Sequence, residues 1–214
     1  YVSTYIERDV RDIGELRHID RFIHLLNILA PRSATLLNKA ELSRTAGIEQ
    51  KTLTNYLSLL EMVFQIKRIQ PYSANQGKRF VKSPKLFFTD SGVLCHLLGL
   101  NSKEILRNSS YYGAILETFV FTELLKAVQY SESPTRLWHY LTSDQHEIDF
   151  LIEREGKVIP VEIKAAKTVR KKDFFHIEEL QSRNPTVKNG VIFYHGEQLF
   201  PLGRNYAIPF SMLF

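Results

Sequence analysis

Cysteine is nearly absent from this chain, which has one such residue among 214. Cys95 has no intrachain partner, so disulfide bonds play no part in holding the protein together. This scarcity fits a reducing cytoplasm. Because Cys95 lies in the apolar run VLCHLLGL, we expect it to pack in a core.

Long apolar runs are also absent. No run of about 18 apolar residues is present to span a bilayer, and no basic segment followed by an apolar one marks a secretion signal. We therefore expect a soluble, cytoplasmic protein with no membrane partner. The chain lacks a starting Met and opens directly into the amphipathic pattern YVSTYIERDVRDI, so we expect a fragment of a longer protein.

Several catalytic motifs are missing as well. The seven histidines show no H-E-x-x-H spacing, and one cysteine cannot build a structural zinc site. The sequence has no nucleophile elbow for Ser-His-Asp catalysis. The phosphate-binding loop G-x-x-x-x-G-K-[ST] is also missing, because Gly77-Lys78 lacks the earlier Gly and is followed by Arg79. We expect no zinc chemistry, and no ATP hydrolysis by this chain alone.

The composition is that of a folded protein. Hydrophobic residues make up 44% of the chain, enough for one or two globular cores. The net charge of +5 suits a polyanionic partner. A surplus this small also occurs in proteins that bind no nucleic acid, so charge alone leaves the partner open.

The most informative pattern is the segment 147–164, EIDFLIEREGKVIPVEIK. Two runs of alternating apolar residues flank Glu155-Gly156, and X-Gly favours a tight two-residue hairpin turn. We expect Pro160 at a bulge or a non-bonded position, since it cannot donate to a ladder. A turn centred there places apolar side chains opposite one another in three pairs, Ile148 with Ile163, Phe150 with Val161, and Ile152 with Ile159.

The other face of this hairpin pairs Asp149 with Glu162, and Lys164 lies two residues beyond. Like charges directly opposed on a sheet are unfavourable, and a bound divalent cation is the obvious reason for such a pair. The alternative is a solvated hairpin face on which Lys164 neutralises Glu147 or Glu162. The basic residues 164–172 suit a nucleic-acid channel, and a solvated helix start explains them almost as well.

The segment 38–61, NKAELSRTAGIEQKTLTNYLSLLE, predicts two helices joined by a short turn at Ala46-Gly47. This pattern resembles a helix-turn-helix, whose second helix enters the DNA major groove. Lys51 is the basic residue on the exposed face of that helix.

The next segment, FQIKRIQPYSANQGKRFVKSPKLFFTD, alternates like two strands around a polar turn, as in a winged helix. We predict that its wing cluster, defined as Lys78, Arg79, Lys82 and Lys85, contacts phosphates. Use of the winged helix for packing or protein contacts remains the alternative.

The hairpin resembles the core of the PD-(D/E)XK nuclease superfamily, with Glu162-Ile163-Lys164 as the second motif element. The resemblance implies that Asp149 and Glu162 hold Mg²⁺ or Mn²⁺, and that Glu117 in the preceding helix GAILETFVFTELLK supplies a further acid. Lys164 would orient the attacking water or neutralise the developing charge. His146 either supports the metal ligands or is a surface-loop histidine.

The whole chain resembles the region that follows the ATPase module in a group of bacterial and archaeal AAA-type ATPases. The matching stretches are YIERDVRDI, LLNKAELSRTAGIEQKTLTNYLSLLE, PYSANQGKRFVKSPKLFFTDSGVLCHLLG, GAILETFVFTELLK, HEIDFLI and VIPVEIKAAKTV. The resemblance implies an α/β (α+β) chain. Residues 1–105 would form a helical lead-in and winged helix, and 106–214 a restriction-endonuclease-like domain with a mixed sheet.

Three functions stay open at this point. The first is a Mg²⁺-dependent nuclease acting on DNA, with Glu117, Asp149, Glu162 and Lys164 as its catalytic residues. The second is a nucleic-acid-binding regulatory region that keeps the fold without turnover. The third is a protein-interaction region that controls an N-terminal ATPase module, where ATP would bind. Homo-oligomer formation is also left open.

Overall fold

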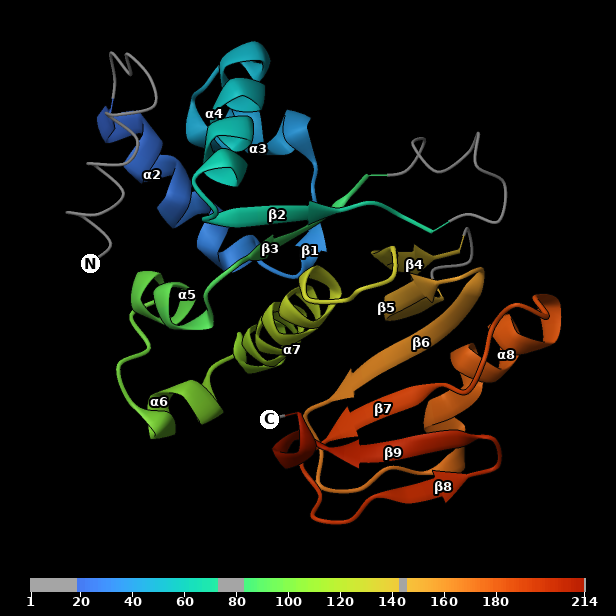
Figure 1. The fold of residues 1–214 in the computed structure, drawn as a ribbon. Coiled ribbons are helices and arrows are strands. Elements are labelled where there is room, and N and C mark those ends of the chain that lie inside the picture. Colours follow the sequence, from blue (N-terminus) through green and yellow to red (C-terminus); the bar gives the residue numbers. More distant parts are fainter. Residues whose placement is uncertain (1–18, 73–82, 143–145, 214) are drawn as a thin grey trace. The chain divides into compact units, whose positions relative to one another are not determined.

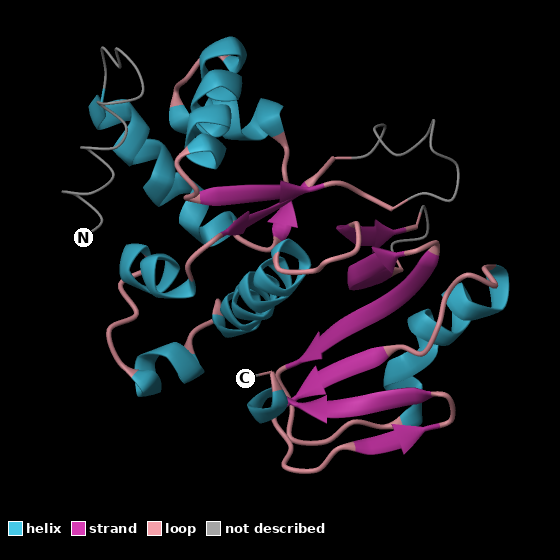
Figure 2. Cartoon of the chain, viewed as in Figure 1, coloured by secondary structure: helices cyan, strands magenta, loops and turns pink. Residues whose placement is uncertain are grey.

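The computed structural model describes residues 19–72, 83–142 and 146–213. It confirms a mixed α/β protein, with one three-stranded and one six-stranded sheet (Figures 1 and 2). The chain divides into two compact units, which are Tyr1–Arg68 with Ser83–Phe119 and Ile69–Lys82 with Val120–Phe214.

The first unit has the element order of a winged helix. Its three-stranded sheet has the strand order β1-β3-β2. Its elements are α2 (Ile19–Leu29), η1 (Ala30–Arg32), β1 (Thr35–Leu36), α3 (Lys39–Ala46), α4 (Gln50–Met62), β2 (Ile66–Ile69), β3 (Lys85–Phe88), α5 (Ser91–Leu97) and α6 (Lys103–Asn108).

Local sequence signals set the helix-turn-helix of this unit. The side chain of Asn38 accepts a hydrogen bond from the Glu41 backbone N–H at 3.1 Å and so caps the start of α3. Gly47 ends α3 in the left-handed conformation, with φ of 61°. On α4, Leu53, Leu57 and others at helical spacing are buried. The two helices and the turn expected from the sequence are therefore confirmed.

The second unit contains a mixed six-stranded sheet in the order β4-β5-β6-β7-β9-β8. Strand β7 runs parallel to both neighbours, β6 and β9, and the other pairs are antiparallel. The strands are β4 (Thr135–Leu141), β5 (Glu147–Arg154), β6 (Lys157–Lys164), β7 (Val191–Tyr194), β8 (Phe200–Leu202) and β9 (Asn205–Pro209). The helices are α7 (Tyr112–Gln129), which begins in the first unit, η3 (Lys171–Phe174), α8 (Phe175–Arg183) and η4 (Phe210–Met212).

Both faces of this sheet are covered. Leu151 belongs to an apolar cluster with Phe174 and Ile177, so η3 and α8 cover one face. The neighbouring Phe150 stacks on Phe121 of α7, with ring centroids 6.2 Å apart. Because successive side chains of a strand point to opposite faces, α7 covers the other one. Along the chain these elements follow the order α7-β4-β5-β6-α8-β7.

The hairpin of β5 and β6 forms where the sequence predicts it. Glu155 and Gly156 form the turn with φ of 52° and 72°, the positive values of a type I′ turn. Phe150 pairs with Val161 and Ile152 with Ile159, as expected. The ladder ends at Phe150, so the expected pairing of Ile148 with Ile163 is replaced by another contact, described below.

Pro160 lies where its missing N–H does not disrupt the pairing of β6 with β7. Pro160 precedes the ladder between β6 and β7, which begins at Val161, so its missing N–H breaks no bond to β7.

At the β4 edge of the sheet, the Tyr72 N–H donates to the His139 carbonyl at 2.7 Å. This pairing explains why the described residues 69–72 group with the second unit, a division that differs from a single boundary at 105/106.

None of the described helices is both long enough and apolar enough to cross a membrane.

Candidate functional site

The structure brings Asp149 and Glu162 together on the β5–β6 hairpin. Both side chains line one pocket, and the negative charge of Asp149 acts on the Glu162 carboxyl group. Asp149 Oδ2 accepts a hydrogen bond from the Ile163 backbone N–H at 2.7 Å. This bond takes the place of the expected backbone pairing and fixes the orientation of the Asp149 carboxylate.

A β-bulge accompanies this arrangement. The register of β4 against β5 shifts between Trp138 and Tyr140. The two β5 residues between Ile148 and Leu151 therefore lie opposite a single β4 residue. An extra residue of this kind re-aims the side chains around it, and such bulges are common beside functional sites. The bulge spans Asp149, which explains how its side chain reaches the neighbouring strand.

The two carboxyl groups open into a pocket of about 390 Å³. Lys164 lies on this pocket, 39% exposed, with its Nζ 3.9 Å from Asp173 Oδ1. The lining residues come from β5, β6, η3 and α8, and they are Glu147, Asp149, Glu162, Lys164, Lys172, Asp173, Phe175 and His176. Four carboxylates against two lysines make the pocket attractive to cations.

Burial raises the pKa of Glu162 well above its ordinary value, and the negative charge of Asp149 raises it further. The positive charge of Lys164 offsets part of this rise. Burial and the neighbouring charge of Asp149 therefore favour the protonated form of Glu162, because two adjacent carboxylates cannot both ionise at low cost. A hard divalent cation prefers such an all-oxygen donor set, and Mg²⁺ or Mn²⁺ fits these residues.

Glu117 is not among the residues that line this pocket. Within the first unit, its Oε1 lies 2.6 Å from the Nζ of Lys85, which is only 3% exposed. The expectation that Lys85 contacts phosphates is therefore corrected, because a buried, ion-paired ammonium is withdrawn from an external anion. The sequence gives no sign of this pairing, since Lys85 and Glu117 lie far apart in the chain.

Of the other residues expected to contact nucleic acid, the structure describes only Lys51. Lys51 is exposed on α4, as expected of a side chain on the outer face of a recognition helix. Lys78, Arg79 and Lys82 of the wing cluster lie outside the described residues.

A second polar cluster adjoins the pocket and was missed by sequence reasoning, which considered only His146. His146 Nδ1 lies 2.9 Å from Glu179 Oε2, and its ring centroid is 4.6 Å from that of His176. Burial lowers the pKa of His176, and the hydrogen bond from His146 lowers the pKa of Glu179. The one available signal was the spacing of His176 and Glu179, three residues apart on a predicted helix.

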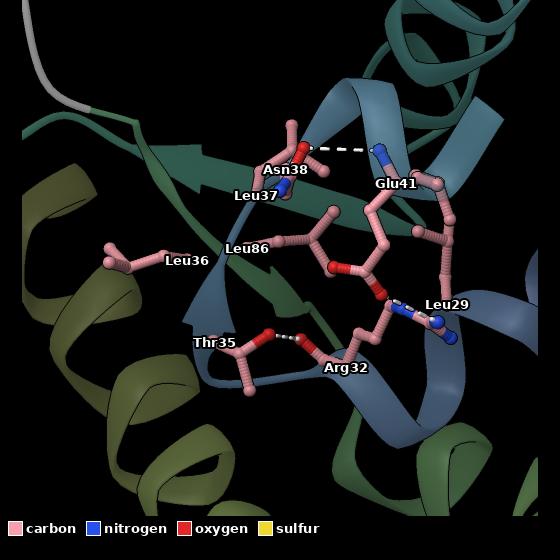
Figure 3. Close-up of a pocket in the computed structure, with 9 residues that line it drawn as sticks. Leu29, Arg32, Thr35, Leu36, Leu37, Asn38, Glu41 and Leu86 are labelled. Atoms are coloured by element: carbon pink, nitrogen blue, oxygen red, sulfur yellow. Dashed lines mark hydrogen bonds and ion pairs between the residues drawn. The ribbon is translucent and has the colours of Figure 1, made fainter. Parts of the chain in front are cut away.

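The first unit has a pocket of its own, of about 280 Å³, shown in Figure 3. Its polar side chains already have partners within the unit. Arg32 lies 3.2 Å from Glu41, and Asn38 caps α3. We therefore regard it as a structural feature of the helix-turn-helix.

Two family models match the chain, one in each half. Residues 1–104 match a family model described as Domain of unknown function (DUF8612). Residues 112–213 match one described as Domain of unknown function (DUF4143). The short segment 105–111 separates the two matches.

Curated relatives match nearly the whole chain. Uncharacterized proteins of Mycobacterium bovis and Mycobacterium tuberculosis are each 29% identical over 204 residues, 94% of this chain. An uncharacterized protein of Haemophilus influenzae is 29% identical over 141 residues, 63% of this chain. The chain spans 44% of the length of the mycobacterial relatives and 32% of the Haemophilus relative.

Proposed function

We propose that the second unit is a Mg²⁺- or Mn²⁺-dependent nuclease of the PD-(D/E)XK type, part of the C-terminal region of an AAA-type ATPase. One observation carries the proposal. Asp149 and Glu162 share a pocket on adjacent strands, and Lys164 lies on the same pocket. This acid, acid and lysine set is the one that the PD-(D/E)XK resemblance implies for metal-dependent phosphodiester hydrolysis.

The roles of the residues follow from their placement. Asp149 and Glu162 would hold the cation, and the bond from Ile163 keeps Asp149 oriented toward it. A bound Mg²⁺ or Mn²⁺ supplies a water of lowered pKa and neutralises charge that develops on the phosphate. Lys164 is partly exposed and reaches the pocket, where its ammonium orients that water or stabilises the oxyanion.

A second candidate function rests on Glu117. The PD-(D/E)XK resemblance assigns this residue to the metal, yet Glu117 pairs with Lys85. A domain without the helix acid fits a non-catalytic region that binds nucleic acid or a protein and regulates the ATPase module. The two remaining carboxylates still form a complete cation-binding pair, so we favour the nuclease.

A cleavage assay separates the two functions. The protein, alone and joined to its ATPase module, is incubated with single- and double-stranded DNA and RNA in Mg²⁺ or Mn²⁺. Asp149→Asn and Lys164→Met should each reduce cleavage by at least about 100-fold, as loss of a charge-stabilising group does. Glu178→Gln is the matched control, because Glu178 is exposed on α8 outside the pocket. Absence of cleavage with every substrate would favour the regulatory region.

A further inference from the structure

Two histidines and a glutamate converge beside the hairpin pocket. One ligand atom from each of His146, His176 and Glu179 lies within 4.8 Å of the other two. All three residues are half-buried, so an ion can reach them from solvent. His176 also lines the pocket that contains Asp149 and Glu162.

The backbone holds this cluster in place. His176 and Glu179 are three residues apart on α8 and therefore project from the same side of the helix. His146 immediately precedes β5, where two hydrogen bonds of 3.0 Å tie its backbone to Thr142. Arg183 lies 2.7 Å from Glu179 Oε1 and leaves Oε2 directed at His146.

The polar atoms of the cluster are not all satisfied by the protein. His146 Nδ1 and Glu179 Oε2 contact each other at 2.9 Å. His176 Nδ1, in contrast, is buried and has no hydrogen-bond partner in the part of the chain that the structure describes. A buried nitrogen without a partner costs about 1–3 kcal/mol. A bound ion is one of the standard explanations for such an atom.

We propose that His146, His176 and Glu179 form a binding site for a divalent cation of the Zn²⁺ class, separate from the carboxylate pair of the hairpin. Imidazole nitrogen selects Zn²⁺, Co²⁺, Ni²⁺ or Cu²⁺ over Mg²⁺, which prefers oxygen. Two histidines and one carboxylate leave the fourth position of a tetrahedral ion to water.

The geometry is close to what such an ion needs. Zn²⁺ with ligands about 2.0–2.1 Å away has ligand atoms about 3.4 Å apart. In the structure the three ligand atoms lie within 4.8 Å of one another, so an ion would need side-chain rotations that adjust these separations. The H-E-x-x-H rule misses this site because its ligands come from two separate segments. The site does not depend on the proposed nuclease.

Calorimetric titration of Zn²⁺ in excess Mg²⁺ tests the site, because Mg²⁺ occupies oxygen ligands and leaves imidazole free. We expect one Zn²⁺ per chain. His146→Gln and His176→Gln should each weaken Zn²⁺ binding by more than about 100-fold. Mutation of a residue that only supports a metal ligand already lowers metal affinity by about 10- to 100-fold. Co²⁺ as a second probe should give visible absorption bands that both substitutions abolish. Circular dichroism checks that each variant is folded.

The control variants should bind Zn²⁺ as tightly as the wild type does. His24→Gln and His96→Gln remove exposed histidines of the first unit and should leave Zn²⁺ affinity unchanged. Asp149→Asn should also leave it unchanged. The proposal is overturned if folded His146→Gln and His176→Gln variants bind Zn²⁺ like the wild type. It is also overturned if either control histidine matters as much, or if Asp149→Asn abolishes binding, which would place the ion on the hairpin.

Discussion

Replacing Glu117 by alanine tests whether this carboxylate stabilises the fold or holds a metal. In the structure its partner is Lys85, 2.6 Å away, and the two side chains are 14% and 3% exposed. Removing one partner of a buried pair leaves the other charge in a poorly solvated place. The cost in such cases is about 3–5 kcal/mol.

The structure favours the lower end of that range. Lys85 Nζ also lies 5.8 Å from the centre of the Phe87 ring, and this contact survives the substitution. We therefore expect Glu117→Ala to lower the free energy of unfolding of the first unit by about 3 kcal/mol. At about 4–8 °C per kcal/mol for a unit near 100 residues, the midpoint of thermal unfolding should fall by at least about 12 °C.

Glu123→Ala is the matched control on the same helix. Glu123 pairs at 2.6 Å with Lys126, which is 59% exposed, so its loss should cost about 0.3–0.5 kcal/mol. The double variant Lys85→Met/Glu117→Leu should regain most of the lost stability, because an apolar pair fills the same space. The reasoning fails if Glu117→Ala unfolds no earlier than Glu123→Ala. Loss of Mg²⁺ binding without loss of stability would instead make Glu117 a metal ligand.

Three further predictions concern pH, the hairpin turn and DNA. The pKa of Glu162 is higher in the folded protein than in the unfolded chain, so the folded state binds more protons between the two values. In EDTA, the free energy of unfolding measured in urea should therefore fall as pH rises from about 4.5 through the raised pKa, and Glu162→Gln should flatten this fall. Gly156 has φ of 72°, so Gly156→Ala should cost about 1 kcal/mol, whereas Gly113→Ala on α7 should not destabilise; equal effects would contradict the turn. If the protein binds duplex DNA, replacing the wing cluster apart from Lys85 by alanine should flatten the dependence of log affinity on log salt by roughly 0.9 per lost contact, and an unchanged slope would point to a protein partner.

Features set by neighbouring residues could be predicted from the sequence. The hairpin turn at Glu155-Gly156 follows from an X-Gly pair between alternating runs, and both φ values are positive as that turn requires. The helix-turn-helix follows from its cap at Asn38 and its left-handed Gly47. The register of the hairpin as far as Phe150 and Val161 follows from the same turn, because a two-residue turn fixes which residues face each other.

Features set by distant residues could not be predicted. The bulge opposite His139 depends on how β4 meets β5, and it turns Asp149 toward Ile163. The burial of Lys85 depends on Glu117, which lies 32 positions away in the chain. The sequence alone therefore led to the prediction that Lys85 contacts phosphate. The cluster around His176 joins two segments that share no motif. In each case tertiary packing, and not local pattern, decides which side chains meet.

Direct measurement of metal binding at the hairpin tests the central claim. Mg²⁺ and Mn²⁺ are titrated by calorimetry into the wild-type chain and into Asp149→Asn, which keeps the shape of the side chain and removes its charge. We predict one binding event in the wild type and no binding in the folded variant, because the charge of Asp149 is needed to hold the ion. A wild-type chain that binds neither ion, or an Asp149→Asn chain that binds both as well as the wild type, would contradict a metal-dependent site on this hairpin.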